Sequence, residues 1–218
     1  PIKVSSTLSM QDKIYLASCD TDPFNRWDSV QSLWLEYILN PEQVIEKDLF
    51  EMIENLFNNE SDYALLSEMI SLPSEQIIHQ NVGKIDVEEV HNQRNQSILS
   101  VASAFKKQLL EMYHQLNHTK AFDLSTQSIG ERALKNKCLS YLSKLGELDI
   151  AYQQFINADC MTDQFGAFQC LLDSKNRYRT EVIAQFYDQH QSDVQVIDKW
   201  FSAQCLASVT SVKDIRDL

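Results

Sequence analysis

Apolar residues recur at helical spacing along almost the whole chain, and this pattern limits the fold to helices. The clearest case begins at Asp22-Pro23, where a carboxylate that can cap a helix precedes proline at the first helical position. With only 4 Gly and 4 Pro in 218 residues, the chain also lacks the turn residues that a many-stranded β fold needs. The apolar residues after this start share one helix face: Phe24, Trp27, Val30, Leu33, Trp34, Tyr37 and Ile38.

Capping and terminating residues set the bounds of the other predicted helices. Ser9 and Asp12 make an acidic capping box, so a first helix should end near Asp20. Asn40-Pro41 ends the second helix, and Gly146 can end a later one in the left-handed conformation. Further helices are expected at 44–57, at 61–70 with Ser61 as the cap, and at 125–146, 148–157, 162–172, 178–190, 193–206 and 211–218.

The segment from Asp86 to Leu116 keeps the helical period for about thirty residues. Its polar middle, Asn92 to Gln96, interrupts the apolar stripe. We therefore expect either one long helix or two helices that meet at this polar stretch.

The number and spacing of these helices indicate how they pack. About ten helices with mostly short loops and no strict sequence repeat predict an irregular armadillo/HEAT-like solenoid, in which neighbouring helices bury each other's apolar faces. The chain is therefore expected to be all-α. It opens with Pro1-Ile2-Lys3-Val4, which is typical of a strand remnant and lacks an initiating Met, so we expect a segment excised from a longer polypeptide.

The formal net charge of -12 argues against anionic partners. Nucleic acids and anionic membranes are bound by a continuous cationic surface. Basic residues such as Arg132, Lys135 and Lys137 are instead interleaved with acids, so we expect solvated helix faces and ion pairs. We predict neither a nucleic-acid partner nor a membrane partner.

The cysteines and the absence of a leader indicate the compartment. Five cysteines form an odd, scattered set without a Cys-x-x-Cys motif, so reduced thiols in the helical core are expected. The sequence contains neither a run of 18 apolar residues nor a basic leader with a cleavage site. A cytoplasmic location is the resulting expectation. The cysteines are Cys19, Cys138, Cys160, Cys170 and Cys205.

No catalytic motif can be assembled from the polar residues. The zinc motif His-Glu-x-x-His is absent, and the nearest spacing is His114 with His118, for which a helix-dipole or solvent role is favoured. A Gly-x-Ser-x-Gly elbow and a Gly-rich phosphate loop are also absent. Carboxylate pairs such as Glu88 and Glu89 are typical of a solvated helix face. We therefore predict no catalytic, cofactor-binding or metal-binding residue in this chain.

Four stretches resemble bacterial aminopeptidase N, in the order in which that family has them. The longest is Asp22-Pro23-Phe24-Asn25-Arg26-Trp27-Asp28, with Gln31 beyond it. The others are Arg132-Ala133-Leu134-Lys135-Asn136 with Cys138-Leu139, then Met161-Thr162-Asp163, and then Asp198-Lys199-Trp200-Phe201 with Gln204.

Each stretch also has a purely structural interpretation. Arg26 is placed to pair with a nearby carboxylate, and Thr162 is a good N-cap. Phe24, Trp27, Trp200 and Phe201 are expected in the core. Packing is favoured over substrate contact for all of them.

The resemblance implies a division of labour within a larger enzyme. Residues 1–8 would end a preceding β-sandwich or linker, and residues 9–218 would be part of a C-terminal helical-repeat domain. The parent would be a zinc-dependent aminopeptidase that removes N-terminal amino acids from peptides, with its zinc and its glutamate base in a separate catalytic domain of the same polypeptide. This helical domain would cover the active-site cleft, limit access to it and bind no zinc itself.

Some residues depart from the family pattern. The family tends to have Asn at the position of Cys160 and small residues at those of Phe165 and Phe168, which puts detailed contacts there in doubt. The alternative function is a free-standing helical-repeat scaffold for protein–protein interactions.

Overall fold

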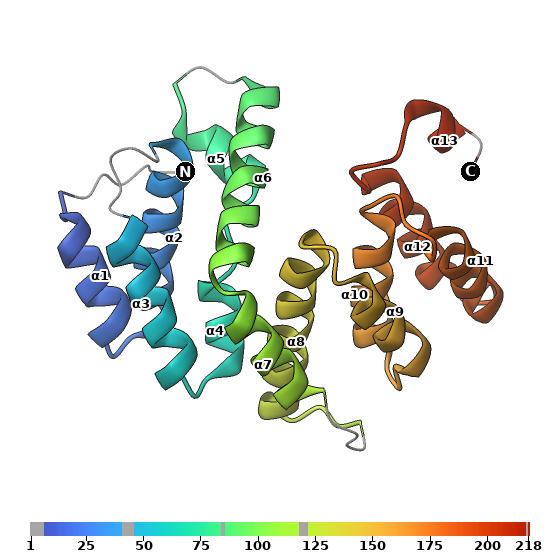
Figure 1. Cartoon of the computed structure of the whole chain (residues 1–218), viewed down its shortest axis with the longest axis horizontal. Helices are drawn as coiled ribbons and strands as arrows, with labels where there is room; N and C mark the ends of the chain where they lie inside the picture. The colour runs from blue at the N-terminus through green and yellow to red at the C-terminus, as the bar shows by residue number, and fades with distance from the viewer. Residues whose placement is uncertain (1–6, 41–45, 84–85, 118–121, 217) are drawn as a thin grey trace. The chain divides into compact units, whose positions relative to one another are not determined.

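The computed structural model describes residues 7–40, 46–83, 86–117, 122–216 and 218. Within these ranges the chain forms thirteen helices and no strand, which confirms the all-α prediction (Figure 1). The predicted strand remnant at 1–6 lies outside the described ranges. The helices are α1 (Met10–Cys19), α2 (Pro23–Leu39), α3 (Glu46–Asn59), α4 (Tyr63–Met69), α5 (Glu75–Asn81), α6 (Val87–Ala104), α7 (Lys106–Leu116), α8 (Thr126–Lys144), α9 (Leu148–Asn157), α10 (Met161–Leu172), α11 (Arg179–His190), α12 (Val194–Leu206) and α13 (Val212–Arg216).

These helices divide into two compact units. Unit 1 comprises the described parts of 1–108 together with 124–134, and unit 2 comprises those of 109–123 together with 135–218. Helices α7 and α8 each contribute residues to both units. Residues 9–218 were expected to belong to one helical-repeat domain, and this stays a prediction. The described helices pack as two compact units.

Local capping chemistry sets the helix starts in unit 1, as predicted. The Asp12 backbone N–H donates to Ser9 Oγ at 3.2 Å, and the Ser9 N–H donates to Asp12 Oδ2 at 2.9 Å, which completes the capping box. The Phe24 N–H donates to Asp22 Oδ1 at 2.8 Å, and Pro23 takes the first position of α2.

The core of unit 1 is built around α2, which packs against α1, α4 and α6. Trp34 is fully buried, and its indole Nε1–H donates to the main-chain oxygen of Met69 at 2.9 Å. The prediction that Phe24 lies in this core is wrong, since 63% of it is exposed, and Trp27 is half-buried. Helix α8 approaches α4 closely, because a Cβ on Gly130 would lie 2.9 Å from the backbone N of Ala64. A glycine is therefore needed at this crossing.

Tertiary packing shifts several boundaries from their predicted positions. The long segment from Asp86 divides at Phe105, not at the polar stretch 92–96, because the buried Phe105 ring packs against Phe50 and Phe57 at centroid distances of 5.2 and 5.7 Å. Helix α5, capped by Ser74, was not predicted. Asp62, not Ser61, caps α4.

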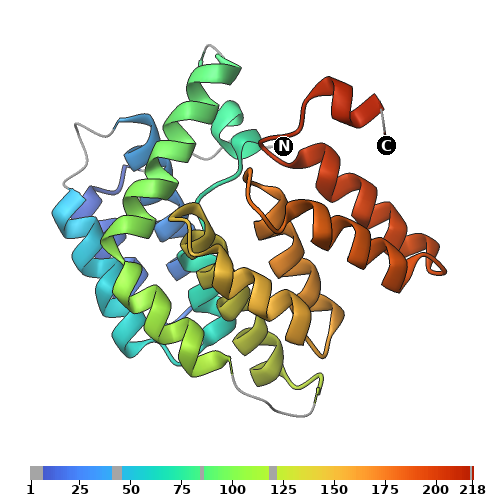
Figure 2. The same ribbon diagram turned by 45° about the vertical axis from the view of Figure 1, so that its right-hand side comes forward.

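Unit 2 contains residues 109–116 of α7, the second half of α8 and helices α9 to α13, which Figure 2 shows from a second side. Its core is aromatic: the Phe168 and Phe186 rings stack at 4.5 Å, and Phe155 and Phe165 pack on Phe168. Gly146 follows α8 with φ of +88°, as predicted for a left-handed terminating residue.

Two predictions about the family-like stretches in unit 2 are wrong. Thr162 lies inside α10 and the N-cap position is Cys160, which has no capping hydrogen bond. Phe201 is not in the core, since 38% of it is exposed, whereas Trp200 is half-buried and donates its indole N–H to Ile183 O at 2.9 Å. The buried residues of α12 are instead Ala203 and Gln204.

The cysteines are all free, as expected, but only two lie in the core. Cys138 and Cys170 are buried, Cys160 is half-buried, and Cys19 and Cys205 are exposed. Among the helices that the structure describes, none combines the length and the apolar character needed to cross a membrane.

Candidate functional site

A buried polar network in unit 2 joins three helices and unites two of the family-like stretches. Lys135 and Asn136 come from α8, Gln154 from α9 and Asp163 from α10. The Lys135 ammonium lies 2.5 Å from Asp163 Oδ2, and Asn136 Nδ2 donates to Asp163 Oδ1 at 2.8 Å. Gln154 Nε2 donates to Asn136 Oδ1 at 2.7 Å and to the Asp163 main-chain oxygen at 2.9 Å. Each helix is thus tied to the other two.

The local fold explains why these side chains meet. Asp163 lies in the first turn of α10, where the helix dipole favours a negative charge. One turn later Gly166 leaves room for the amide of α8, because a Cβ there would lie 2.6 Å from Asn136 Oδ1. The Lys135 and Asp163 side chains are 9% and 7% exposed, so the expectation of a solvated face is wrong for Lys135, although the expected ion pair is present.

The chemistry of this network is structural. Both Asp163 oxygens accept hydrogen bonds, one from an ammonium and one from an amide, so the carboxylate is not free to take a proton from a substrate. Because burial of one unpaired charge is costly, the pair holds α8 and α10 in one register. We therefore assign the network a structural role, in which it fixes these helices relative to one another.

One group of potential metal ligands shares Asp163 with this network. Asp159, Cys160 and Asp163 each offer a ligand atom, and these atoms lie within 4.8 Å of one another. The group does not fit a resident cation, since the Lys135 ammonium already neutralises Asp163 at 2.5 Å and would repel a metal ion. This group is therefore not the binding site of the zinc that the resemblance implies. The absence of a metal site in this chain stays a prediction.

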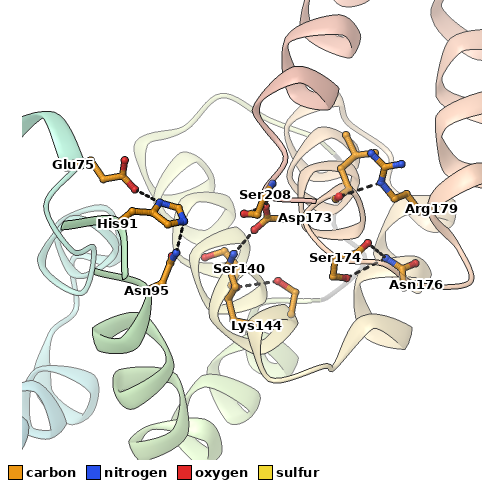
Figure 3. Close-up of polar contacts among 12 residues, drawn as sticks. Glu75, His91, Asn95, Ser140, Lys144, Asp173, Ser174, Asn176, Arg179 and Ser208 are labelled. Atoms are coloured by element: carbon orange, nitrogen blue, oxygen red, sulfur yellow. Dashed lines mark hydrogen bonds and ion pairs between the residues drawn. The ribbon is translucent and has the colours of Figure 1, made fainter. Parts of the chain in front are cut away.

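A second polar cluster in unit 2 ties the ends of α8, α10 and α12 together (Figure 3). Lys144 pairs with Asp173 Oδ2, and Asp173 Oδ1 accepts from the Ser208 N–H at 2.8 Å and from its hydroxyl at 2.5 Å. Burial alone would raise the Asp173 pKa, but the hydrogen bonds from Lys144 and Ser208 outweigh it, and the pKa lies below its ordinary value. The carboxylate is therefore held charged.

A pocket of about 290 Å³ lies beside this cluster. One of its lining residues is Cys170, whose pKa burial raises to about 11. At neutral pH this side chain is a thiol and not a reactive thiolate. The pocket therefore presents no thiolate at neutral pH.

In unit 1 the histidine with the best-defined partners is His91 (Figure 3). Its Nδ1 lies 2.7 Å from Glu75 Oε1, and its Nε2 lies 2.8 Å from Asn95 Nδ2, so both ring nitrogens are occupied. The contact links α5 to α6. His118 lies outside the described residues, so the predicted role of the His114 and His118 pair has no structural test.

Arg26, in the longest family-like stretch, makes the carboxylate pair that was predicted. Its guanidinium lies 2.6 Å from Glu60 Oε2, and its Nε–H donates to the Ala17 main-chain oxygen at 3.0 Å. Arg26 thus joins the start of α2 to α1 and to the residue that follows α3. Sequence reasoning found this partner type, but it missed the pairing of Lys135 with Asp163, which lie 28 residues apart.

Comparison with known proteins decides the family. Residues 10–218 match the family model described as "Domain of unknown function (DUF3458_C) ARM repeats". The chain belongs to this ARM-repeat family. The predicted helical-repeat fold is therefore confirmed. The resemblance to aminopeptidase N is confirmed by the relatives described next.

Three curated bacterial relatives are each named aminopeptidase N. The protein of Escherichia coli (strain K12) is 27% identical over 97% of this chain and 26% of its own length. That of Haemophilus influenzae is 24% identical over 100% of the chain and 26% of its length. That of Caulobacter vibrioides is 25% identical over 94% of the chain and 25% of its length. The chain thus spans about a quarter of the length of these relatives.

A solved structure has the same fold. The crystal structure of Legionella pneumophila aminopeptidase A in complex with aspartic acid matches with a TM-score of 0.80 and 22% identity. The match covers 93% of this chain and 26% of that one. At this identity the likeness concerns the fold alone.

Proposed function

We propose that this chain is the non-catalytic C-terminal helical domain of a larger zinc-dependent aminopeptidase. One observation carries the proposal: three aminopeptidase N relatives match 94–100% of the chain but only 25–26% of their own lengths. The chain therefore corresponds to one part of such proteins. The rest of the polypeptide would contain the catalytic residues and the zinc.

The side chains of this domain support a role other than catalysis. The carboxylates of its two polar clusters, Asp163 and Asp173, are neutralised by lysines, and the buried thiol of Cys170 is protonated at neutral pH. The zinc that the activity uses would be bound by another part of the parent polypeptide. The domain would lie over the cleft of the catalytic domain and limit entry to peptides with a free N-terminus, within the cytoplasm.

The location of the chemistry can be tested by comparing the 218-residue chain with the complete protein from the same reading frame. We expect the complete protein to hydrolyse an alanyl amide, to lose this activity with a chelator and to regain it with zinc. The chain alone should give no turnover with added zinc. Turnover by the chain alone, or a complete protein without peptidase activity, would overturn the proposal.

The limit on access has its own test. A short peptide with a free amine should be shortened by the complete protein, whereas the same residues at the start of a stably folded protein should stay intact. Both substrates carry the same first residues, so the comparison isolates size. Equal cleavage rates would contradict a domain that restricts the cleft.

A further inference from the structure

The first turn of α2 carries an aromatic side chain that is mostly exposed in the part of the chain that the structure describes. Phe24 is 63% exposed, and its ring lies 5.6 Å, centroid to centroid, from the ring of the half-buried Trp27. The other two aromatic residues of the same helix, Trp34 and Tyr37, are buried. The Phe24 and Trp27 rings, which we call the aromatic pair, thus form the exposed end of the α2 core.

The backbone beneath the aromatic pair is firmly held. Asp22 Oδ1 accepts from the Phe24 N–H at 2.8 Å, and Asn25 donates to Asp20 Oδ2 at 3.3 Å. Arg26 lies between the Ala17 main-chain oxygen and the Glu60 carboxylate, with both charged side chains largely buried. An exposed aromatic ring on such a fixed turn loses little further freedom when a partner covers it.

The surroundings of the aromatic pair define the partner's chemistry. Asp22 and Asp28 are exposed, and Asp20 is half-buried, so three carboxylates between the end of α1 and the second turn of α2 lie close to the pair in sequence. A complementary surface would offer an apolar pocket for the rings with lysine or arginine at its edge. Rigid aromatic anchors of this kind supply much of the binding energy of protein interfaces.

We propose that the aromatic pair is the anchor of a docking surface for the part of the parent polypeptide that lies outside this chain. The inference rests on the proposed function, because the relatives that match this chain are about four times as long, the chain covering 25–26% of each. Most of such a polypeptide is thus available as the occupant. Phe24 would serve the contact between domains and not the stability of unit 1.

The test compares Phe24→Ser with Tyr15→Ser, which changes an exposed aromatic residue on α1 of the same unit, 68% exposed. In the 218-residue chain, both variants should leave the urea midpoint unchanged. In the complete protein, Phe24→Ser should accelerate limited proteolysis between the helical domain and the remainder roughly tenfold or more, as the loss of an interface anchor would. Tyr15→Ser should not, and Phe24→Leu should restore most of the protection.

Several outcomes would overturn the inference. Equal proteolysis of the two serine variants in the complete protein would show that Phe24 is not an interface anchor. A lower urea midpoint for Phe24→Ser in the chain alone would show instead that Phe24 stabilises unit 1. A chain that sediments as a dimer until Phe24 is changed would make a second copy the occupant. Proteolysis is independent of turnover, so a complete protein that is protected through Phe24 but inactive would refute the enzyme and leave the docking surface standing.

Discussion

The Lys135 ammonium lies 2.5 Å from the Asp163 carboxylate, and both side chains are more than nine-tenths buried. Removing one partner leaves the other charge buried without compensation. Asp163→Ala should therefore lower the free energy of unfolding by about 3–5 kcal/mol, measured by urea denaturation at pH 7.

Two further variants separate the charge from the contact. Asp163→Asn keeps the shape and the Asn136 partner but leaves the lysine unpaired, so we expect it to be nearly as destabilising as Asp163→Ala. The double variant Lys135→Met with Asp163→Leu removes both charges and should recover most of the loss. A double variant as unstable as the singles would mean that the hydrogen bonds of Asn136 and Gln154, not the charges, dominate.

Gly130 tests the close approach of α8 to α4. An alanine in a helix normally gains about 1 kcal/mol over glycine. Here the added Cβ would lie 2.9 Å from the backbone N of Ala64, which cannot rotate away as a side chain can. Overpacking costs about 1–3 kcal/mol, so Gly130→Ala should be destabilising overall in thermal unfolding. Gly83→Ala, which meets nothing within 4 Å, is the control, and a Gly130→Ala variant as stable as that control would refute the crossing.

The cysteines should separate into reactive and protected groups. Burial raises the pKa of Cys138 to about 12 and that of Cys170 to about 11, so almost no thiolate forms at pH 8. Native protein treated with a thiol reagent at this pH should be labelled at the exposed Cys19 and Cys205, and Cys138 and Cys170 should react only after unfolding. Peptide mass spectrometry assigns the sites, and native labelling of Cys138 would show that its helix opens readily.

Asp173 gives a pH-dependent contribution to stability. Its pKa is below the ordinary value of 3.8 in the folded state, because the hydrogen bonds from Lys144 and Ser208 outweigh the effect of burial. The contribution is complete above the unfolded-state value and is lost as the pH falls through the lower folded-state value. Asp173→Asn should therefore cost about 1 kcal/mol at pH 7, and the difference from the unchanged protein should shrink below about pH 4 in urea titrations. A difference that stays constant down to pH 3 would exclude this carboxylate as the source.

Features that depend on neighbouring residues were predictable from the sequence. The Ser9 and Asp12 box, the Asp22-Pro23 start and the left-handed Gly146 each need only a few adjacent residues, and the structure has all three. The break at Phe105 was not predictable, because it depends on rings from α3 that fix where α6 ends. Polar residues at 92–96 remain helical since a solvated helix face accepts them.

In the candidate site, too, contacts between residues distant in sequence were not predictable. The types of residue in the network were visible within the family-like stretches, but Lys135 was expected on a solvated face. Its partner Asp163 lies 28 residues away on another helix, and spacing along one helix predicts only contacts three or four residues apart. Phe201 was expected in the core for its size, whereas the rotation of α12 places Gln204 there instead.

The tryptophans give the two units separate natural fluorophores. Trp200 is the only tryptophan in the sequence of unit 2, and its indole N–H is fixed to Ile183 O on α11, whereas Trp27 and Trp34 belong to unit 1. In a protein with Trp27 and Trp34 changed to phenylalanine, emission would follow the opening of α11 from α12 alone. Comparison with a Trp200→Phe protein would then reveal, without any attached label, whether the two cores melt in one cooperative step or in two.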